Sequence, residues 1–120
     1  MELRAVQRNG VTCAVVHSEE LVMKDVESAL EVLMQAKYDL GTGNVVISKE
    51  LIVPEFFILS TGIAGEILQK YVTYGGRIGI YGDFSQYTSK PLKDFIYESN
   101  RGRDVFFADS EEDALCRLTR

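Results

Sequence analysis

A hydroxyl-rich turn near the middle of the chain is the first place where the sequence could support chemistry. Ser60, Thr61 and Gly62 follow an apolar stretch and precede a helical pattern, so they are expected to open a helix beside a sheet. A hydroxyl at a helix start can accept a backbone N–H as an ordinary cap, or it can carry a phosphate that the helix dipole favours. Ser60 and Thr61 are therefore candidate phosphoacceptors, with capping as the open alternative.

A second group of polar residues follows the apolar run 77–81. Open α/β sheets bind ligands outside the carboxyl ends of their strands, and Gly82-Asp83-Phe84-Ser85 is expected at such an end. Residues 48–50 and 109–110 are expected at the matching ends of the neighbouring strands, which would form a polar rim around the Ser60 helix start. Turn and capping chemistry also explains these residue types. The candidate ligand or partner surface comprises Gly62, Gly65, Asp83, Phe84, Ser85 and Tyr87.

Gly62 and Gly65 in this set lie three residues apart on one face of the expected helix. Close packing of the helix on the sheet is the usual reason for such glycines, and the approach of a ligand to the backbone is the alternative.

The residues that enzymes and metal sites need are scarce. His17 is the only histidine, so a histidine-activated nucleophile and a zinc cluster are both disfavoured. The glycine pairs at 41–43 and 75–76 precede strands, whereas a phosphate-cradling loop precedes a helix. We expect no enzymatic activity, no catalytic residue, no metal ligand and no cofactor.

The charge balance bears on the partners. The formal net charge is -5, and Arg101-Gly102-Arg103, with Lys93 nearby, is the only local basic cluster. Nucleic-acid binding needs a larger array of clustered cations, so we expect no nucleic-acid partner.

The apolar segments and the cysteines bear on the compartment. No apolar run approaches the roughly 20 residues that span a membrane, and the first residues do not lead into a signal peptide. Cys13 and Cys116 are both in apolar contexts and are expected to be buried, reduced thiols. A bacterial-type cytoplasmic protein without a membrane partner fits these features.

Turn and cap signals locate the elements that must position these residues. Asn9-Gly10 separates two β-rich runs, which predicts a hairpin because a type I′ turn needs positive φ at both central residues. Strands separated by single helices predict a mostly parallel sheet with the hairpin as its antiparallel edge. The result is one α/β domain over residues 1–120. The expected order, ββαβαβαβα, has strands at 2–8, 11–16, 45–47, 77–81 and 104–108 and helices that begin at Asp25, Ser60, Ser89 and Ser110.

Periodicity predicts the core. Helical spacing also places Met34 and Val72 on the inward faces of their helices. Most aromatic side chains near the rim are expected in the core, with a pocket or partner surface as the alternative; these are Phe56, Phe57, Tyr81, Phe84 and Tyr87. The residues expected to be buried are Val46, Ile67, Leu68, Ile80 and Phe106.

The order of elements and two of its joints resemble the sulfate-transporter and anti-sigma-factor-antagonist (STAS) domain. Phosphorylatable STAS domains carry Asp-Ser-Ser-Gly at the start of the helix after the third strand, and Leu59-Ser60-Thr61-Gly62 stands at that joint here. The resemblance implies that Thr61 takes the phosphoacceptor position and Ser60 the neighbouring one. Two departures stand out: Leu59 replaces the acid, and residues 51–57 are inserted between strand and helix.

The segment 47–107 is more similar to a bacterial domain-of-unknown-function family, number 4180. The shared pieces are Ser-Thr-Gly-Ile-Ala-Gly-Glu at 60–66, Gly-Asp-Phe-Ser at 82–85 and Asn-Arg-Gly-Arg at 100–103. This resemblance implies no activity.

The function expected from these observations is a non-enzymatic, STAS-like regulatory or protein-interaction module. Its working surface is expected at the Ser60–Glu66 helix start and the Gly82–Tyr87 loop. The alternative is a small-molecule or anion-binding domain that uses the polar rim. A protein partner of unknown identity is expected, and a homo-oligomer is left open.

Overall fold

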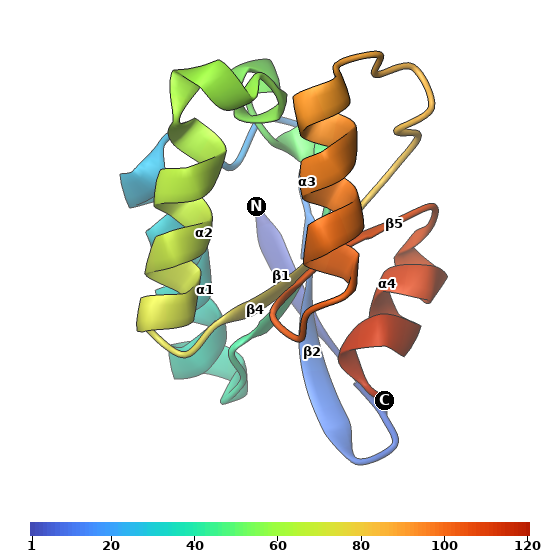
Figure 1. Ribbon diagram of the computed structural model, residues 1–120. Helices are drawn as coiled ribbons and strands as arrows, with labels where there is room; N and C mark the ends of the chain where they lie inside the picture. Colours follow the sequence, from blue (N-terminus) through green and yellow to red (C-terminus); the bar gives the residue numbers. More distant parts are fainter.

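The structure, a computed structural model, describes residues 1–120 as a five-stranded sheet with four α-helices (Figure 1). The predicted α/β class, the element order and the antiparallel edge are confirmed. Three short 3₁₀ helices between β3 and α2 were not predicted. The strands are β1 (Glu2–Arg8), β2 (Val11–His17), β3 (Asn44–Ser48), β4 (Arg77–Tyr81) and β5 (Val105–Ala108), and the helices are α1 (Val26–Leu40), α2 (Ile63–Thr73), α3 (Lys90–Asn100) and α4 (Glu111–Leu118).

The strands stand in the sheet in the same order as in the sequence, β1-β2-β3-β4-β5. β1 and β2 pair antiparallel through Asn9 and Gly10, both with positive φ as a type I′ turn requires, and all later pairs are parallel. Right-handed crossovers that always step in one direction put their helices on one face of the sheet. Accordingly, α1, α2 and α3 cover the face that carries Val45, Ile47 and Ile80 (Figure 1).

The opposite face of the sheet is covered by α4. Its core contains Cys13, Val15 and Val46 from the strands and Leu115 and Leu118 from the helix. Because β3 is central and buried on both faces, it reads as a continuous apolar run. The predicted core residues Val46, Ile67, Leu68, Ile80 and Phe106 are all buried.

The burial of three other side chains corrects the sequence predictions. Met34 and Val72 are exposed, because each lies at the margin of its helix's apolar stripe. Cys116 is an exposed free thiol, whereas Cys13 is buried as expected. Burial raises the pKa of the Cys13 thiol.

Three helix caps follow the prediction. The carboxylate of Asp25 and the hydroxyls of Ser89 and Ser110 accept backbone N–H groups at the starts of α1, α3 and α4. No helix has the length and apolarity needed to cross a membrane.

Candidate functional site

The segment between β3 and α2 forms one wall of the site. It folds as three 3₁₀ helices: η1 (Lys49–Leu51), η2 (Pro54–Phe57) and η3 (Leu59–Thr61). A backbone bridge between Ile52 and Met23 ties the segment to the chain before α1, and the N–H of Val53 donates to the carbonyl of Met23 at 2.9 Å. The side chains of Phe56 and Phe57, at the end of η2, are buried in the core. The segment is therefore a fixed wall with its own core contacts.

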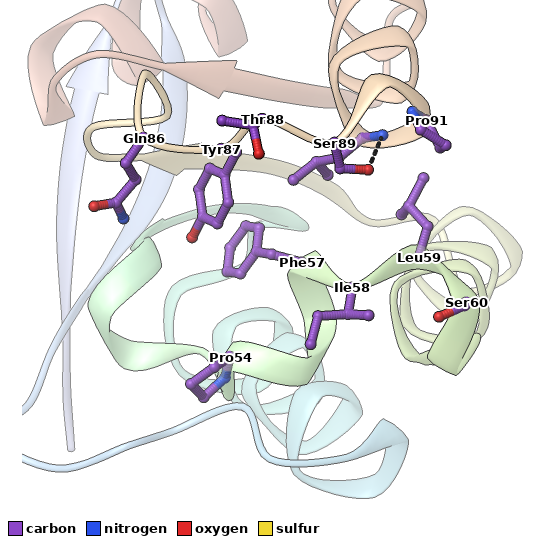
Figure 2. Close-up of a pocket in the computed structure, with 11 residues that line it drawn as sticks. Pro54, Phe57, Ile58, Leu59, Ser60, Gln86, Tyr87, Thr88, Ser89 and Pro91 are labelled. Carbon is purple, nitrogen blue, oxygen red and sulfur yellow. Dashed lines mark hydrogen bonds between the residues drawn. The ribbon is translucent and has the colours of Figure 1, made fainter.

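The second wall is the loop between β4 and α3, and a pocket of about 580 Å³ lies between the two. We call this pocket the Phe57 groove. Figure 2 shows Phe57 and Leu59 extending from the first wall toward the loop, with Tyr87 beside Phe57. The lining comprises Pro54, Phe57, Ile58, Leu59, Ser60, Gln86, Tyr87, Thr88, Ser89, Pro91 and Leu92.

Aromatic stacking holds the two walls together at one end of the groove. The rings of Phe57 and Tyr87 stack with centroids 5.4 Å apart. Behind them, Phe84 packs edge-on against Phe107 of β5 with centroids 5.5 Å apart. Phe84 thus anchors the loop instead of facing the groove, while Phe57 and Tyr87 serve as both packing and lining. Tyr81 lies on the other face of the sheet, the one covered by α4, where its hydroxyl is 3.4 Å from the Glu111 carboxylate.

The two candidate phosphoacceptors have different surroundings. The Thr61 hydroxyl lies 2.8 Å from the Ile58 carbonyl and 2.9 Å from the Glu55 carbonyl, so its proton is engaged within the η2–η3 turns. It also accepts the N–H of Ile63 at 3.3 Å. Ser60 is exposed and lines the Phe57 groove.

The start of α2 differs from the prediction. Gly62, not a hydroxyl, occupies the N-cap position, and its φ of 79° is readily adopted only by glycine. A Cβ at Gly62 or at Gly65 would meet no atom within 4 Å, so helix-on-sheet packing does not explain either glycine. Gly65 is exposed on the surface of α2.

Asp83 and Ser85 form a closed local turn. The Asp83 carboxylate accepts the Ser85 hydroxyl at 2.5 Å and its backbone N–H at 2.9 Å. These two hydrogen bonds, with a smaller contribution from the Lys49 charge, lower the pKa of Asp83. Neither residue lines the Phe57 groove, so turn chemistry accounts for this part of the rim. Ser48 and Ser110 likewise act as caps.

Lys49 is the unexpected member of the rim. Its side chain is only 7% exposed, and its ammonium donates to the Tyr87 hydroxyl at 3.3 Å and lies 4.8 Å from the centre of that ring. The Glu50 carboxylate is 3.8 Å away. The lysine stem lies across Gly82, where a Cβ would approach Lys49 Cγ to 2.6 Å. Sequence position placed Lys49 on the rim, but its burial follows from Gly82 and Tyr87, which are distant in sequence.

The structure thus brings Ser60 and Tyr87 to one groove and leaves the other candidates outside it. Thr61, Gly62 and Gly65 lie at the start of α2 beyond the lining, and Phe84 is packed behind it. No group of three or more histidine, cysteine, aspartate or glutamate side chains is arranged to hold a metal ion.

In a comparison with protein families, the model described as "Domain of unknown function (DUF4180)" matches residues 8–118. Because the match covers most of the chain, the chain belongs to this family. Neither the curated proteins nor the solved structures contain a match to it.

Proposed function

We propose that this DUF4180 protein is a non-enzymatic regulatory module of STAS-like architecture that binds a partner protein through the Phe57 groove. The carrying observation is that Ser60 and Tyr87, from the two segments of the expected working surface, line one pocket. A pocket of about 580 Å³ with a mainly apolar wall suits side chains inserted from a partner. The proposal places the module in a bacterial cytoplasm, where the exposed thiol of Cys116 would stay reduced.

The departure from the STAS pattern supports this assignment of the surface. Residues 51–57, which are inserted relative to that pattern, include the end of η1 and all of η2, and thus form part of the first wall of the groove. An insertion that builds a wall with buried anchors such as Phe56 and Phe57 adds a surface to the domain. The groove would then be what distinguishes this family's binding from that of other STAS-like modules.

Ile58 is the residue that a partner would contact first. It is 54% exposed and stands between Phe57, which is buried, and Leu59, which is half-buried. Ile58 lines the Phe57 groove together with Phe57 and Leu59, and an exposed apolar patch that is contiguous in this way is typical of protein contact sites.

Partner capture from the native host tests the proposal. Wild-type protein, Ile58→Glu and Tyr38→Glu are compared; Tyr38 is 91% exposed on α1, away from the groove, and supplies the matched control. We expect one or more proteins to be captured by wild type and by Tyr38→Glu, and to be lost with Ile58→Glu. Equal capture by all three would remove the groove as the binding surface.

Modification of Ser60 is the regulatory step that fits the groove. The Ser60 side chain is exposed at the groove's margin, whereas the Thr61 hydroxyl is engaged with two carbonyls. A phosphate would bring almost two negative charges to a surface that a partner must desolvate. We expect Ser60→Glu to weaken capture of the partner and intact-mass measurement of native protein to show an added phosphate. Unmodified protein under all growth conditions, with capture unchanged in Ser60→Glu, would make Ser60 a lining residue only.

The buried ammonium of Lys49 favours a second candidate function, the binding of a small anion. A pocket of about 460 Å³ beside the Phe57 groove includes Lys49, Gln86 and Tyr87 in its lining. One hydrogen bond to Tyr87 leaves further N–H donors on the ammonium for a carboxylate or phosphate. Amide shift titrations with inorganic phosphate and with acetate test this. Shifts at residues 49 and 87 that vanish in Lys49→Met, which keeps the apolar stem over Gly82, would support it; their persistence would exclude it.

A further inference from the structure

Five arginines from separate parts of the chain meet around one pocket at the opposite end of the sheet. The pocket measures about 530 Å³, and Phe106 is its only hydrophobic lining residue. We propose that this pocket binds a small molecule through its phosphate groups. The arginines are Arg77, Arg101, Arg103, Arg117 and Arg120.

Arg77 is the fixed centre of the arrangement. It begins β4, its Nε donates to the Arg103 carbonyl at 2.8 Å, and its Nη1 donates to the Leu118 carbonyl at 3.0 Å. Its guanidinium carbon lies 5.9 Å from the centre of the Phe106 ring. Two of its five N–H donors are thereby engaged with protein carbonyls, and the others remain for a ligand.

The surrounding arginines are largely free of acidic partners. Arg117 pairs with Asp113 at 3.3 Å, and Arg101 lies over the Tyr97 ring with its guanidinium carbon 5.7 Å from the ring centre. No ion pair engages Arg101, Arg103 or Arg120. Asp104 is the single acidic residue in the lining.

The negative ends of two helix dipoles offset only part of this positive charge. The pocket lies at the carboxyl ends of α3 and α4, which run toward the same end of the sheet in Figure 1, and cations are favoured there. Each helix end carries about half a negative charge, and Asp104 and Asp113 carry one each. The side chains of the five arginines therefore exceed these negative charges by about two. A chain whose net charge is -5 concentrates this excess in one concave place.

Phosphate is the ligand chemistry that such a pocket fits. Guanidinium groups present paired N–H donors that match phosphate oxygens and form strong, charge-assisted hydrogen bonds. The pocket volume lies within the range of small-molecule sites. The acidic surface elsewhere would repel an extended nucleic acid, so a compact phosphorylated molecule is the better occupant.

The site is separate from the Phe57 groove. Arg77 is the first residue of β4 and the groove's loop follows the last, Tyr81, so the two sites are on the order of 15 Å apart along the strand. The proposal therefore stands whether or not the groove binds a partner.

Two triple variants that remove the same charge test the site. Arg101→Gln/Arg103→Gln/Arg120→Gln changes three exposed residues of the pocket. The control, Arg4→Gln/Lys24→Gln/Lys90→Gln, changes three exposed residues elsewhere. Calorimetric titrations use inorganic phosphate, pyrophosphate and ADP, which separate a free-phosphate site from a nucleotide site.

We expect at least one of the three probes to bind wild type, with Kd raised about tenfold or more in the pocket variant and changed less than about twofold in the control. Equal weakening in both variants would show a general charge effect and overturn the proposal. Absence of binding by all three probes at millimolar concentration would also overturn it, as would tighter binding of single-stranded DNA than of pyrophosphate.

Discussion

Gly82 shows how one residue without a side chain determines the position of a charge. Its φ is 154°, and an added Cβ would lie 2.6 Å from Lys49 Cγ and 2.8 Å from Cδ. Gly82→Ala is therefore expected to displace the lysine stem and to destabilise the fold by about 1–3 kcal/mol. Urea unfolding measures the loss. Gly65→Ala is the control, because Gly65 is in open space on α2 and alanine there should be neutral or stabilising. Similar losses in both variants would contradict this account of Gly82.

Leu68 and Val72 separate the buried and exposed margins of α2. Leu68 is 7% exposed in the main core and Val72 is 53% exposed one turn later. We expect Leu68→Ala to lower the free energy of unfolding by about 2–5 kcal/mol. Val72→Ala should change it by less than about 0.5 kcal/mol. Urea denaturation of both variants provides the measurement, and a loss below about half a kcal/mol for Leu68→Ala would show that its side chain is not packed as described.

At the scale of elements, α1 and α2 are joined by a buried hydrogen bond. The Tyr71 hydroxyl of α2 donates to the Ala29 carbonyl of α1 at 2.8 Å, and burial raises the pKa of Tyr71 well above its usual value. Tyr71→Phe removes the donor and keeps the ring, so it should cost about 1–3 kcal/mol. Thermal and urea unfolding measure this cost. An unchanged stability would mean that water reaches the carbonyl.

The start of α1 makes stability depend on pH. Asp25 accepts the Ser28 N–H at 2.8 Å, and its hydrogen bonds with Ser28, the backbone one foremost, lower the pKa of Asp25. A lowered pKa in the folded state stabilises the protein above the unfolded-state pKa of about 3.9, and this stabilisation disappears as pH falls through the folded-state pKa.

The difference in Tm between wild type and Asp25→Ala should therefore shrink as the pH falls from about 5 to about 2. Ser89→Ala removes an uncharged cap from α3 and serves as the control, because its effect on Tm should not change with pH. Circular dichroism melting curves give both differences. A constant difference for Asp25→Ala would mean that the carboxylate charge does not contribute to the cap.

Local signals made the elements predictable, and their absence explains what was missed. Asn9-Gly10, Asp25, Ser89 and Ser110 each act within a few residues of their own position, and the structure has them as expected. The 3₁₀ segment after β3 has no such signature, because its shape depends on contacts with Met23 and on the burial of aromatic rings. For the same reason, α2 begins at Ile63 and not at Ser60 as predicted.

At the scale of the whole molecule, protection against exchange should follow the position of each strand in the sheet. β3 is central, and Val46 is fully buried, whereas Asn9 is exposed in the β1–β2 turn. We expect the Val46 amide to exchange only through global unfolding and the Asn9 amide to exchange rapidly. Hydrogen exchange followed by NMR measures both, and equal rates would contradict the central place of β3.

Sites made from several elements were the least predictable part of the molecule. Arg101 and Arg103 form too small a cluster in the sequence, but the fold adds Arg77 from β4, Arg117 from α4 and Arg120, which follows α4. The Lys49 side chain is likewise buried by residues of another loop. Whether such residues meet depends on how the crossover connections arrange the ends of helices and strands in space. The spacing of residues within one segment of the sequence does not give this arrangement. The proximity of Ser60 and Tyr87 could be predicted from the sequence, because they follow β3 and β4, which are adjacent and parallel.

The sequential strand order has a consequence for synthesis on the ribosome. Each strand pairs with the one made just before it, so the sheet can grow as the chain emerges. Its second face cannot be closed in that way, because α4 follows all five strands. Until α4 emerges, Cys13, Val15 and Val46 form an open apolar surface that chaperones can bind and on which the Cys13 thiol is accessible to alkylating reagents. The labelling of Cys13 on stalled chains would thus report the moment at which α4 docks.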